Sequence, residues 1–245
     1  MARIPRVLTG CGLVIAAGLA VLLGSPVQPA GATPDATSLY HEAMATTKSW
    51  TVHYSSESTG SGGPFLETGD AGPASGTQAI LVGRGATLDS AVLIVIGDFT
   101  FLEGNELAME DLAGLPPTQA ATATGHWVMF STNNAMFAQL VVGVRSHDVA
   151  QEIALRGPYT LDPPRKLFGH EVDAIRGTES VGGDDRAPAV LYVRASGRHL
   201  PVEEDSVGPQ GKTDGDVHIV FSRWGEPVKP LAPPAGIAIG PVSSA

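Results

Sequence analysis

The stretch that decides the fold is SAVLIVI at positions 90–96, followed by the turn Gly97-Asp98 and by FTFLE at 99–103. The first segment is apolar at every position after Ser90, so both of its faces are expected to be covered, as in a strand at the middle of a sheet. The residues after the glycine-aspartate turn favour a second strand. The sequence therefore predicts two adjacent strands inside a larger sheet.

The segments on either side of this pair predict an α+β protein. Helices are expected at 37–48, at 105–114 and over 133–155, where the pattern is expected to break near Gly143. Residues 58–76 are rich in Gly, Ser, Pro and Thr and predict turns or a weak hairpin. Further strands are expected at 50–57, 77–83, 126–131, 158–163, 170–178, 188–195, 199–207 and 216–223. Strands early and late with helices between them favour a curved antiparallel sheet, a half-barrel, covered on its concave face by a few helices.

The N-terminal residues have the pattern of a secretory signal peptide. A basic start precedes an apolar run over 7–24, and Ala30-Gly31-Ala32 offers a small-residue cleavage site. Cleavage after Ala32 is expected, with an uncleaved anchor as the alternative, because the run is at the short edge of a membrane span. Leu8-Thr9-Gly10-Cys11 spells a lipobox, but most of the apolar run follows Cys11, so no lipid anchor is expected there. The protein is therefore predicted to be exported, to the cell envelope or the extracellular space.

The rest of the chain shows no internal repeat and no clear linker. The expected organisation is a signal peptide at 1–32, a single domain at 33–235 and a flexible C-terminal tail at 236–245, whose surroundings are rich in proline. Fifteen basic against 25 acidic side chains give a formal net charge of −10, which argues against nucleic acid as a partner. The single cysteine excludes an internal disulfide and a zinc site of several cysteines.

The sequence contains no motif that predicts a catalytic, metal or cofactor site. The segment TGSGG at 59–63 lacks the spaced glycines of a nucleophile elbow. Histidines stand beside acids only as sequence neighbours, which do not converge on one ligand. The carboxylate pairs Glu203-Glu204 and Asp184-Asp185 lie in polar surroundings and are expected to be surface charge. The sequence thus predicts a protein that is not an enzyme and needs no cofactor.

Several short motifs resemble one family. They are GHWV at 125–128, HLPV at 199–202, DVHIVFS at 216–222 and WGEPV at 224–228, followed by APP at 232–234. Together with the order of elements, they resemble the actinobacterial envelope lipoproteins that include LprG and LppX, which are related in fold to the LolA and LolB lipoprotein carriers. The resemblance covers most of 35–235. It implies a half-barrel that encloses an apolar cavity for acyl chains and carries lipid or lipidated molecules without catalysis, with possible membrane association. It supplies no catalytic or ligand-contacting residue.

Candidates for the lining of such a cavity are apolar side chains on the central strands and the covering helices. They are Val92, Ile94, Ile96, Phe137, Leu140, Val141, Val144, Ile153 and Leu191. The alternative is that these side chains pack a solid core, as apolar stripes usually do. In that case the protein would be a non-catalytic envelope scaffold or a partner-binding module with a closed core. The sequence identifies neither a lipid nor a protein partner.

Overall fold

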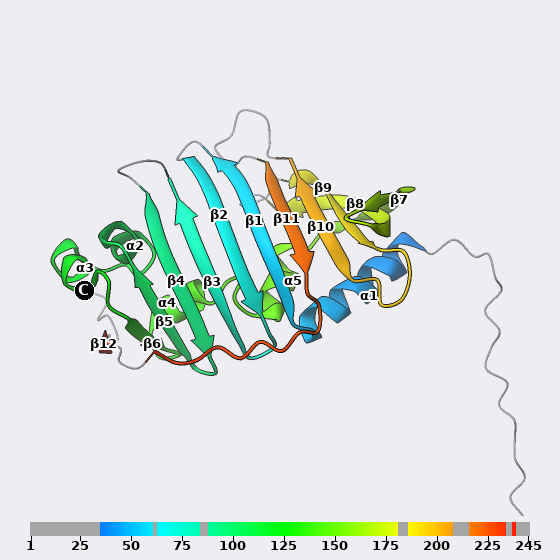
Figure 1. The fold of residues 1–245 in the computed structure, drawn as a ribbon. Coiled ribbons are helices and arrows are strands. Elements are labelled where there is room, and N and C mark those ends of the chain that lie inside the picture. The colour runs from blue at the N-terminus through cyan, green and yellow to red at the C-terminus, as the bar shows by residue number, and fades with distance from the viewer. Residues whose placement is uncertain are drawn as a thin grey trace, which may run out of the picture. The chain divides into compact units, whose positions relative to one another are not determined.

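The computed structural model describes residues 35–60, 63–83, 88–180, 186–207, 216–233 and 237–238. The predicted signal peptide and Cys11 lie outside the described residues. Within the described part, five helices lie on one face of a single sheet (Figure 1). The helices are α1 (Ala36–Ser49), α2 (Glu106–Asp111), α3 (Pro117–Ala123), α4 (Ala135–Leu140) and α5 (Ser146–Glu152). The helix α3 was not predicted, and it begins at one of the two prolines that end the preceding segment.

The sheet has the order β12-β6-β5-β4-β3-β2-β1-β11-β10-β9-β8-β7. Its strands are β1 (Val52–Gly60), β2 (Gly63–Ala71), β3 (Ser75–Val82), β4 (Asp89–Ile96), β5 (Phe99–Gly104), β6 (Val128–Ser131), β7 (Arg156–Leu167), β8 (His170–Ser180), β9 (Arg186–Arg194), β10 (Pro201–Ser206), β11 (Val217–Ser222) and β12 (Ile237–Ala238). All neighbouring pairs are antiparallel except β12 and β6. The expected α+β fold, a curved antiparallel sheet under a few helices, is confirmed.

Local sequence patterns predict the adjacent strands β4 and β5, but they do not predict β2. The strands β4 and β5 pair as expected across the Gly97-Asp98 turn. The segment 58–76, predicted as turns or a weak hairpin, instead contains the nine-residue strand β2, which pairs with β1 and β3 along its length. Hydrogen bonding on both edges holds this polar, glycine-containing strand in place, and its sequence shows no apolar alternation that would announce it.

The pleat of β4 separates its side chains onto two different surfaces. Leu93 and Val95 are buried on the face that the helices cover, at 1% and 0% exposure. Val92, the residue before Leu93, is 43% exposed on the opposite face. The expectation that both faces of this strand are covered is therefore wrong at Val92. We call the helix-covered face of the sheet the inner face and the opposite one the outer face.

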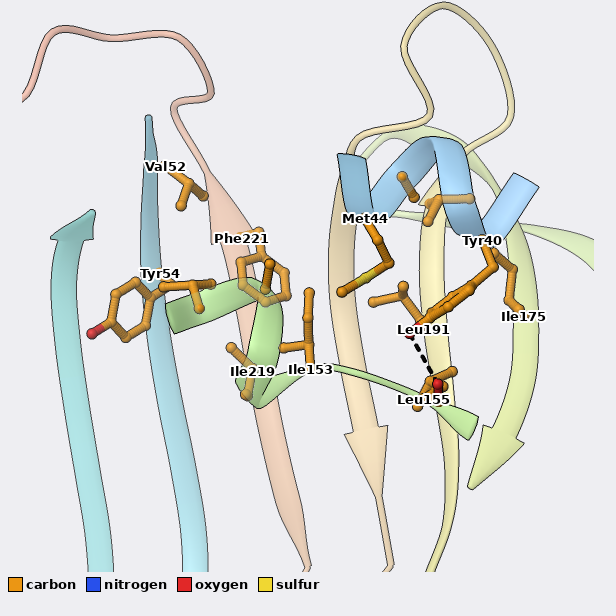
Figure 2. Packing of buried hydrophobic residues seen from close by; sticks show 14 of the residues in the cluster. Tyr40, Met44, Val52, Tyr54, Ile153, Leu155, Ile175, Leu191, Ile219 and Phe221 are labelled. Carbon is orange, nitrogen blue, oxygen red and sulfur yellow. Dashed lines mark hydrogen bonds between the residues drawn. The ribbon is translucent and has the colours of Figure 1, made fainter. Parts of the chain in front are cut away.

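The larger core lies under α1 and α5. The helix α1 is capped by Asp35, whose carboxylate accepts a hydrogen bond from the Ser38 amide at 3.1 Å. Its apolar side, with Tyr40 and Met44, points at Leu191 of β9, as Figure 2 shows, and the Tyr40 hydroxyl donates to the Leu155 carbonyl at 2.9 Å. A second cluster joins α2 and α3 to β3–β6 and includes Met109 and Leu102, both fully buried. A third, smaller cluster packs Val95 of β4 against α4, so the described inner face is covered by three packed clusters.

The C-terminal segment crosses the outer side of the sheet. After β11 the Trp224 indole donates a hydrogen bond to the Pro201 carbonyl at 2.9 Å, and residues 227–233 then run toward β6 (Figure 1). Within the stretch for which a flexible tail is predicted, Ile237 and Ala238 form β12 beside Val128 and Met129. Among the helices of the described residues, none combines the length and the apolar character that a membrane span needs.

Candidate functional site

A cavity of about 330 Å³ lies between the inner face of β2–β4 and the segments that carry α2, α4 and α5. Apolar side chains supply most of its wall: Phe65, Ile80, Leu93, Leu112, Leu140 and Val142. Polar groups also line it: Glu67, Gln78, Asp111, Gln139 and Glu152. Its volume falls within the range of about 300–1,000 Å³ that is typical of small-molecule pockets. The cavity combines an apolar wall with a few polar groups, as ligand sites commonly do.

One wall of the cavity carries a buried hydrogen-bonded network across three strands. The Tyr54 hydroxyl donates to Glu67 Oε1 at 2.8 Å, and Gln78 Nε2 donates to the Tyr54 hydroxyl at 2.9 Å and to Glu67 Oε1. A Cβ atom at Gly69 would lie 2.7 Å from the Tyr54 ring, so only glycine lets that ring cross β2. The hydroxyl of Tyr54 points away from the apolar cluster in Figure 2. The Tyr54 hydroxyl therefore fixes two polar side chains of the cavity wall, Glu67 and Gln78.

The turn between α4 and α5 brings a second carboxyl group to the same place. Gly143 has a φ of +76°, and a Cβ atom there would lie 2.9 Å from Glu67 Oε1 and 3.4 Å from Glu152 Oε2. The carboxyl groups of Glu67 and Glu152 therefore converge on this turn, one from the sheet and one from the end of α5. The expected break of the helical pattern near Gly143 is confirmed, and the break serves to form the cavity wall.

One further glutamate extends the acidic character along the inner face. Glu204 of β10 pairs with Ile219 and Leu191, both of which are core residues, and it is 1% exposed. Its Oε1 atom is buried and has no hydrogen-bond partner among the described residues. Glu203 is 7% exposed on the outer side. The expectation that Glu203-Glu204 is surface charge is wrong, because alternation along β10 buries one residue on each face of the sheet. Asp184-Asp185 lies outside the described residues.

Burial and mutual repulsion raise the pKa values of these inner carboxyl groups. Burial, followed by the charges of Glu179, Asp205 and Glu152, raises the pKa of Glu204 to about 9. Burial also raises the pKa of Glu67, although the hydrogen bond from Tyr54 opposes it. The carboxyl of Glu152 is accessible at the cavity wall, and surrounding protein and the charges of Glu67 and Glu179 raise its pKa. The inner face thus holds acids that retain protons more firmly than surface glutamates do.

The nine predicted cavity residues lie in four different environments. Leu140 lines the cavity. The side chains of Phe137, Val141 and Val144 pack around Val95 in a small buried cluster, while Ile153 and Leu191 are part of the larger core. The remaining three, Val92, Ile94 and Ile96, have the outer-face parity of β4. Local sequence patterns do not predict the polar wall, because the residues of that wall come from a strand without a clear pattern and from a helix end.

A group of three possible metal ligands lies on the outer face, away from the cavity. Glu203, Asp205 and His218 hold ligand atoms within 4.8 Å of one another, the one such group found among the described residues. His218 Nδ1 lies 2.7 Å from Asp205 Oδ1, and both side chains are more than two-fifths exposed. An exposed hydrogen bond between His218 and Asp205 accounts for this arrangement. Only strand pairing brings these residues together, so the sequence gives no spacing that would reveal them.

Comparison with solved structures identifies proteins with a similar fold. LprF from Mycobacterium bovis superimposes with a TM-score of 0.53 at 16% identity, over 83% of this chain and 99% of that one. The lipoprotein LppX from Mycobacterium tuberculosis gives a TM-score of 0.47 at 16% identity, over 79% of this chain and 97% of that one. No protein-family model matches the chain, and no curated protein matches it significantly.

The protein therefore has the fold of LprF. The resemblance to lipoproteins of the LprG and LppX type that the sequence motifs predict is confirmed at the level of the fold. At this level of identity the likeness defines the fold of the chain and leaves its ligand to be argued from the cavity.

Proposed function

We propose that this chain is an exported cell-envelope protein that binds lipid or acyl chains in the cavity between β2–β4 and the covering helices, and that it does so without catalysis. The observation that carries the proposal is the apolar part of the cavity wall, since an unfilled apolar space offers a hydrocarbon chain shelter from water. The predicted signal peptide and the resemblance of the motifs at 199–228 to the LprG and LppX family support the location and the class of ligand.

The rim of the cavity offers a way to test this proposal with little risk to folding. Val142 lines the cavity and is 57% exposed, so a larger side chain there can enter the opening without displacing the core. Val207, after β10, is 54% exposed and is not part of the cavity wall. The two valines are thus matched in residue type and exposure, and they differ in their position relative to the cavity.

The experiment measures the binding of pyrene-labelled dodecanol, an uncharged ligand whose alkyl chain stands in for an acyl chain, by fluorescence titration. Val142→Trp is expected to weaken binding by about tenfold or more, because the indole occupies space that the chain needs. Val207→Trp is expected to bind like the wild type. Equal binding by both variants, or no binding by the wild-type protein, would overturn the proposal and favour a module with a closed core. Native mass spectrometry of gently extracted protein provides an independent check for bound lipid.

A further inference from the structure

The hydrogen bond between His218 and Asp205 on the outer face leaves a third side chain to be explained. Glu203 offers a carboxyl oxygen that lies within 4.8 Å of ligand atoms on both of them. It is 7% exposed, although it lies on the face that the helices do not cover. In the part of the chain that the structure describes, no hydrogen bond from outside this group of three reaches the Glu203 carboxyl. A buried carboxyl group is therefore directed at a histidine and a second carboxyl group.

The pairing of β10 with β11 fixes the positions of the three side chains. Asp205 and His218 are register partners across these two strands, and Glu203 lies two residues before Asp205, on the same face of the sheet. Both strands are paired along both edges, β10 with β9 and β11, and β11 with β10 and β1. The ligand atoms therefore converge from a hydrogen-bonded backbone and not from a loop, which is the kind of support that a preorganised site requires.

The charges around Glu203 leave two carboxyl groups close together. Burial, followed by the charge of Asp205, raises the pKa of Glu203, and the charges of His218 and Arg165 oppose this effect. The Arg165 guanidinium lies 3.8 Å from the centre of the Tyr192 ring, where a cation–π contact engages it beside the group. A cation between the two carboxyl groups would relieve their repulsion.

The types of ligand atom indicate which cation fits. One imidazole nitrogen with two carboxylate oxygens suits a first-row transition ion such as Zn²⁺, whereas Ca²⁺ and Mg²⁺ prefer oxygen ligands alone. Zinc binds these atoms at about 2.0–2.2 Å, which places the ligand atoms of one tetrahedral ion roughly 3–3.5 Å apart. The described ligand atoms already lie within 4.8 Å of one another, so small side-chain rotations close the remaining distance.

From this geometry we propose that Glu203, Asp205 and His218 form a binding site for one divalent transition-metal ion of the Zn²⁺ type. The site lies on the outer face, away from the cavity, so the inference goes beyond the proposed function and does not depend on it. Three protein ligands leave a coordination position of the ion to solvent. A bound ion would join β10 to β11 through their side chains, and it would stabilise the folded chain because the unfolded chain does not hold the three ligands together.

The test is isothermal titration of ZnCl₂ into the chelator-treated, untagged full chain at pH 7.5, where one ion per chain is expected to bind. His218→Ala removes the nitrogen ligand at a position where the side chain is 48% exposed, and it is expected to weaken zinc binding by about 100-fold or more. Asp205→Asn and Glu203→Gln keep the shapes of their side chains and are expected to weaken it by about tenfold or more. His170→Ala is the matched control, because His170 is also an exposed histidine and stands beside an acid, Glu171, outside the group. It is expected to bind zinc like the wild type.

Two further measurements identify the ligand and separate loss of the site from loss of the fold. Nitrogen-15 NMR of the histidine rings is expected to show a zinc-induced shift at His218, and none at His170. Zinc is expected to raise the melting temperature of the wild-type protein and not that of His218→Ala, whereas the two proteins should melt alike without zinc.

Three results would overturn the proposal. The first is wild-type binding of Zn²⁺ that is no tighter than about 1 mM. The second is an equal loss of affinity in His218→Ala and His170→Ala, because exposed histidines would then bind the ion without a defined site. The third is Ca²⁺ binding as tight as that of Zn²⁺ and unchanged in His218→Ala, which would indicate a carboxylate site without the histidine.

Discussion

The Tyr54 hydroxyl donates a hydrogen bond of 2.8 Å to Glu67 on the neighbouring strand, although the register partner of Tyr54 is Gly69 and that of Glu67 is Ser56. The contact is therefore diagonal, and it runs over the residue that has no side chain. Because both groups are buried, this bond satisfies a carboxyl group that would otherwise be isolated at the cavity wall. The missing side chain at Gly69 thus permits the hydrogen bond that satisfies Glu67 at the cavity wall.

Removing the hydroxyl in Tyr54→Phe is expected to lower the free energy of unfolding by about 1–3 kcal/mol, since a buried acceptor and a buried donor lose a partner. It is also expected to raise the pKa of Glu67, because the bond from Tyr54 is what opposes the effect of burial there. Urea denaturation and carboxyl-carbon NMR titration measure the two effects. Tyr159→Phe, which removes a bond to the Leu155 carbonyl, serves as the control and should not move the pKa of Glu67.

The raised pKa of Glu204 predicts that stability falls as pH rises. In the unfolded chain this carboxyl loses its proton near its ordinary pKa of 4.5, whereas in the folded protein it retains the proton to about 9. Between these values the folded state binds the additional proton, so the contribution is fully present below 4.5 and is lost as pH rises toward 9. Glu204→Gln should make the dependence of the unfolding free energy on pH shallower, by up to about 1.4 kcal/mol per pH unit over this range.

Chemical denaturation at a series of pH values measures this change in slope. Glu57→Gln, at an exposed outer position, is the matched control and should keep the wild-type slope. Wild-type and Glu204→Gln curves that run parallel from pH 5 to pH 9 would contradict the assignment of a raised pKa to this carboxyl group.

Neighbouring side chains of β4 point to opposite faces, so truncating two of them is expected to lower the free energy of unfolding by unequal amounts. Leu93→Ala removes a side chain that is 1% exposed and packs with the α2 cluster, so it should lower the free energy of unfolding by about 2–5 kcal/mol. Val92→Ala removes a side chain that is 43% exposed and should cost less than about 1 kcal/mol. Thermal or urea unfolding of the two variants checks the direction in which β4 faces, and similar costs would contradict it.

This same strand shows what the sequence could predict and what it could not. Its length, its turn and its place within the sheet followed from the apolar run and the Gly97-Asp98 pair. Its orientation did not, because a strand that is apolar at every position contains no alternation to mark the buried face. The sequence therefore predicts Val92, Ile94 and Ile96 as cavity residues, whereas Leu93 on the other face lines the cavity.

The polar part of the site was hidden for a different reason. Glu67 comes from a strand whose glycines and threonines predict turns, and Glu152 is the last residue of a short helix. Their proximity depends on how α5 packs over the sheet, which no local pattern specifies. Glu204 stands next to Glu203 in polar surroundings, and only the pairing of β10 with β11 and β9 shows that Glu204 is in register with core residues.

Gly143 provides the last prediction, because its position and its backbone conformation can be tested separately. Gly143→Ala places a Cβ atom in a left-handed conformation and also within 2.9 Å of Glu67 Oε1. Gly97 has a φ of +56°, and a Cβ atom there would meet nothing within 4 Å. Gly97→Ala should therefore show the conformational cost alone, about 1–2 kcal/mol. Gly143→Ala should cost about 1–3 kcal/mol more, since the new methyl group must displace the carboxyl groups that converge on the turn. Urea denaturation of both variants measures the difference. Equal losses in the free energy of unfolding would mean that Glu67 and Glu152 do not lie as close to the turn as the structure indicates. The turn would then not position the acidic wall of the cavity.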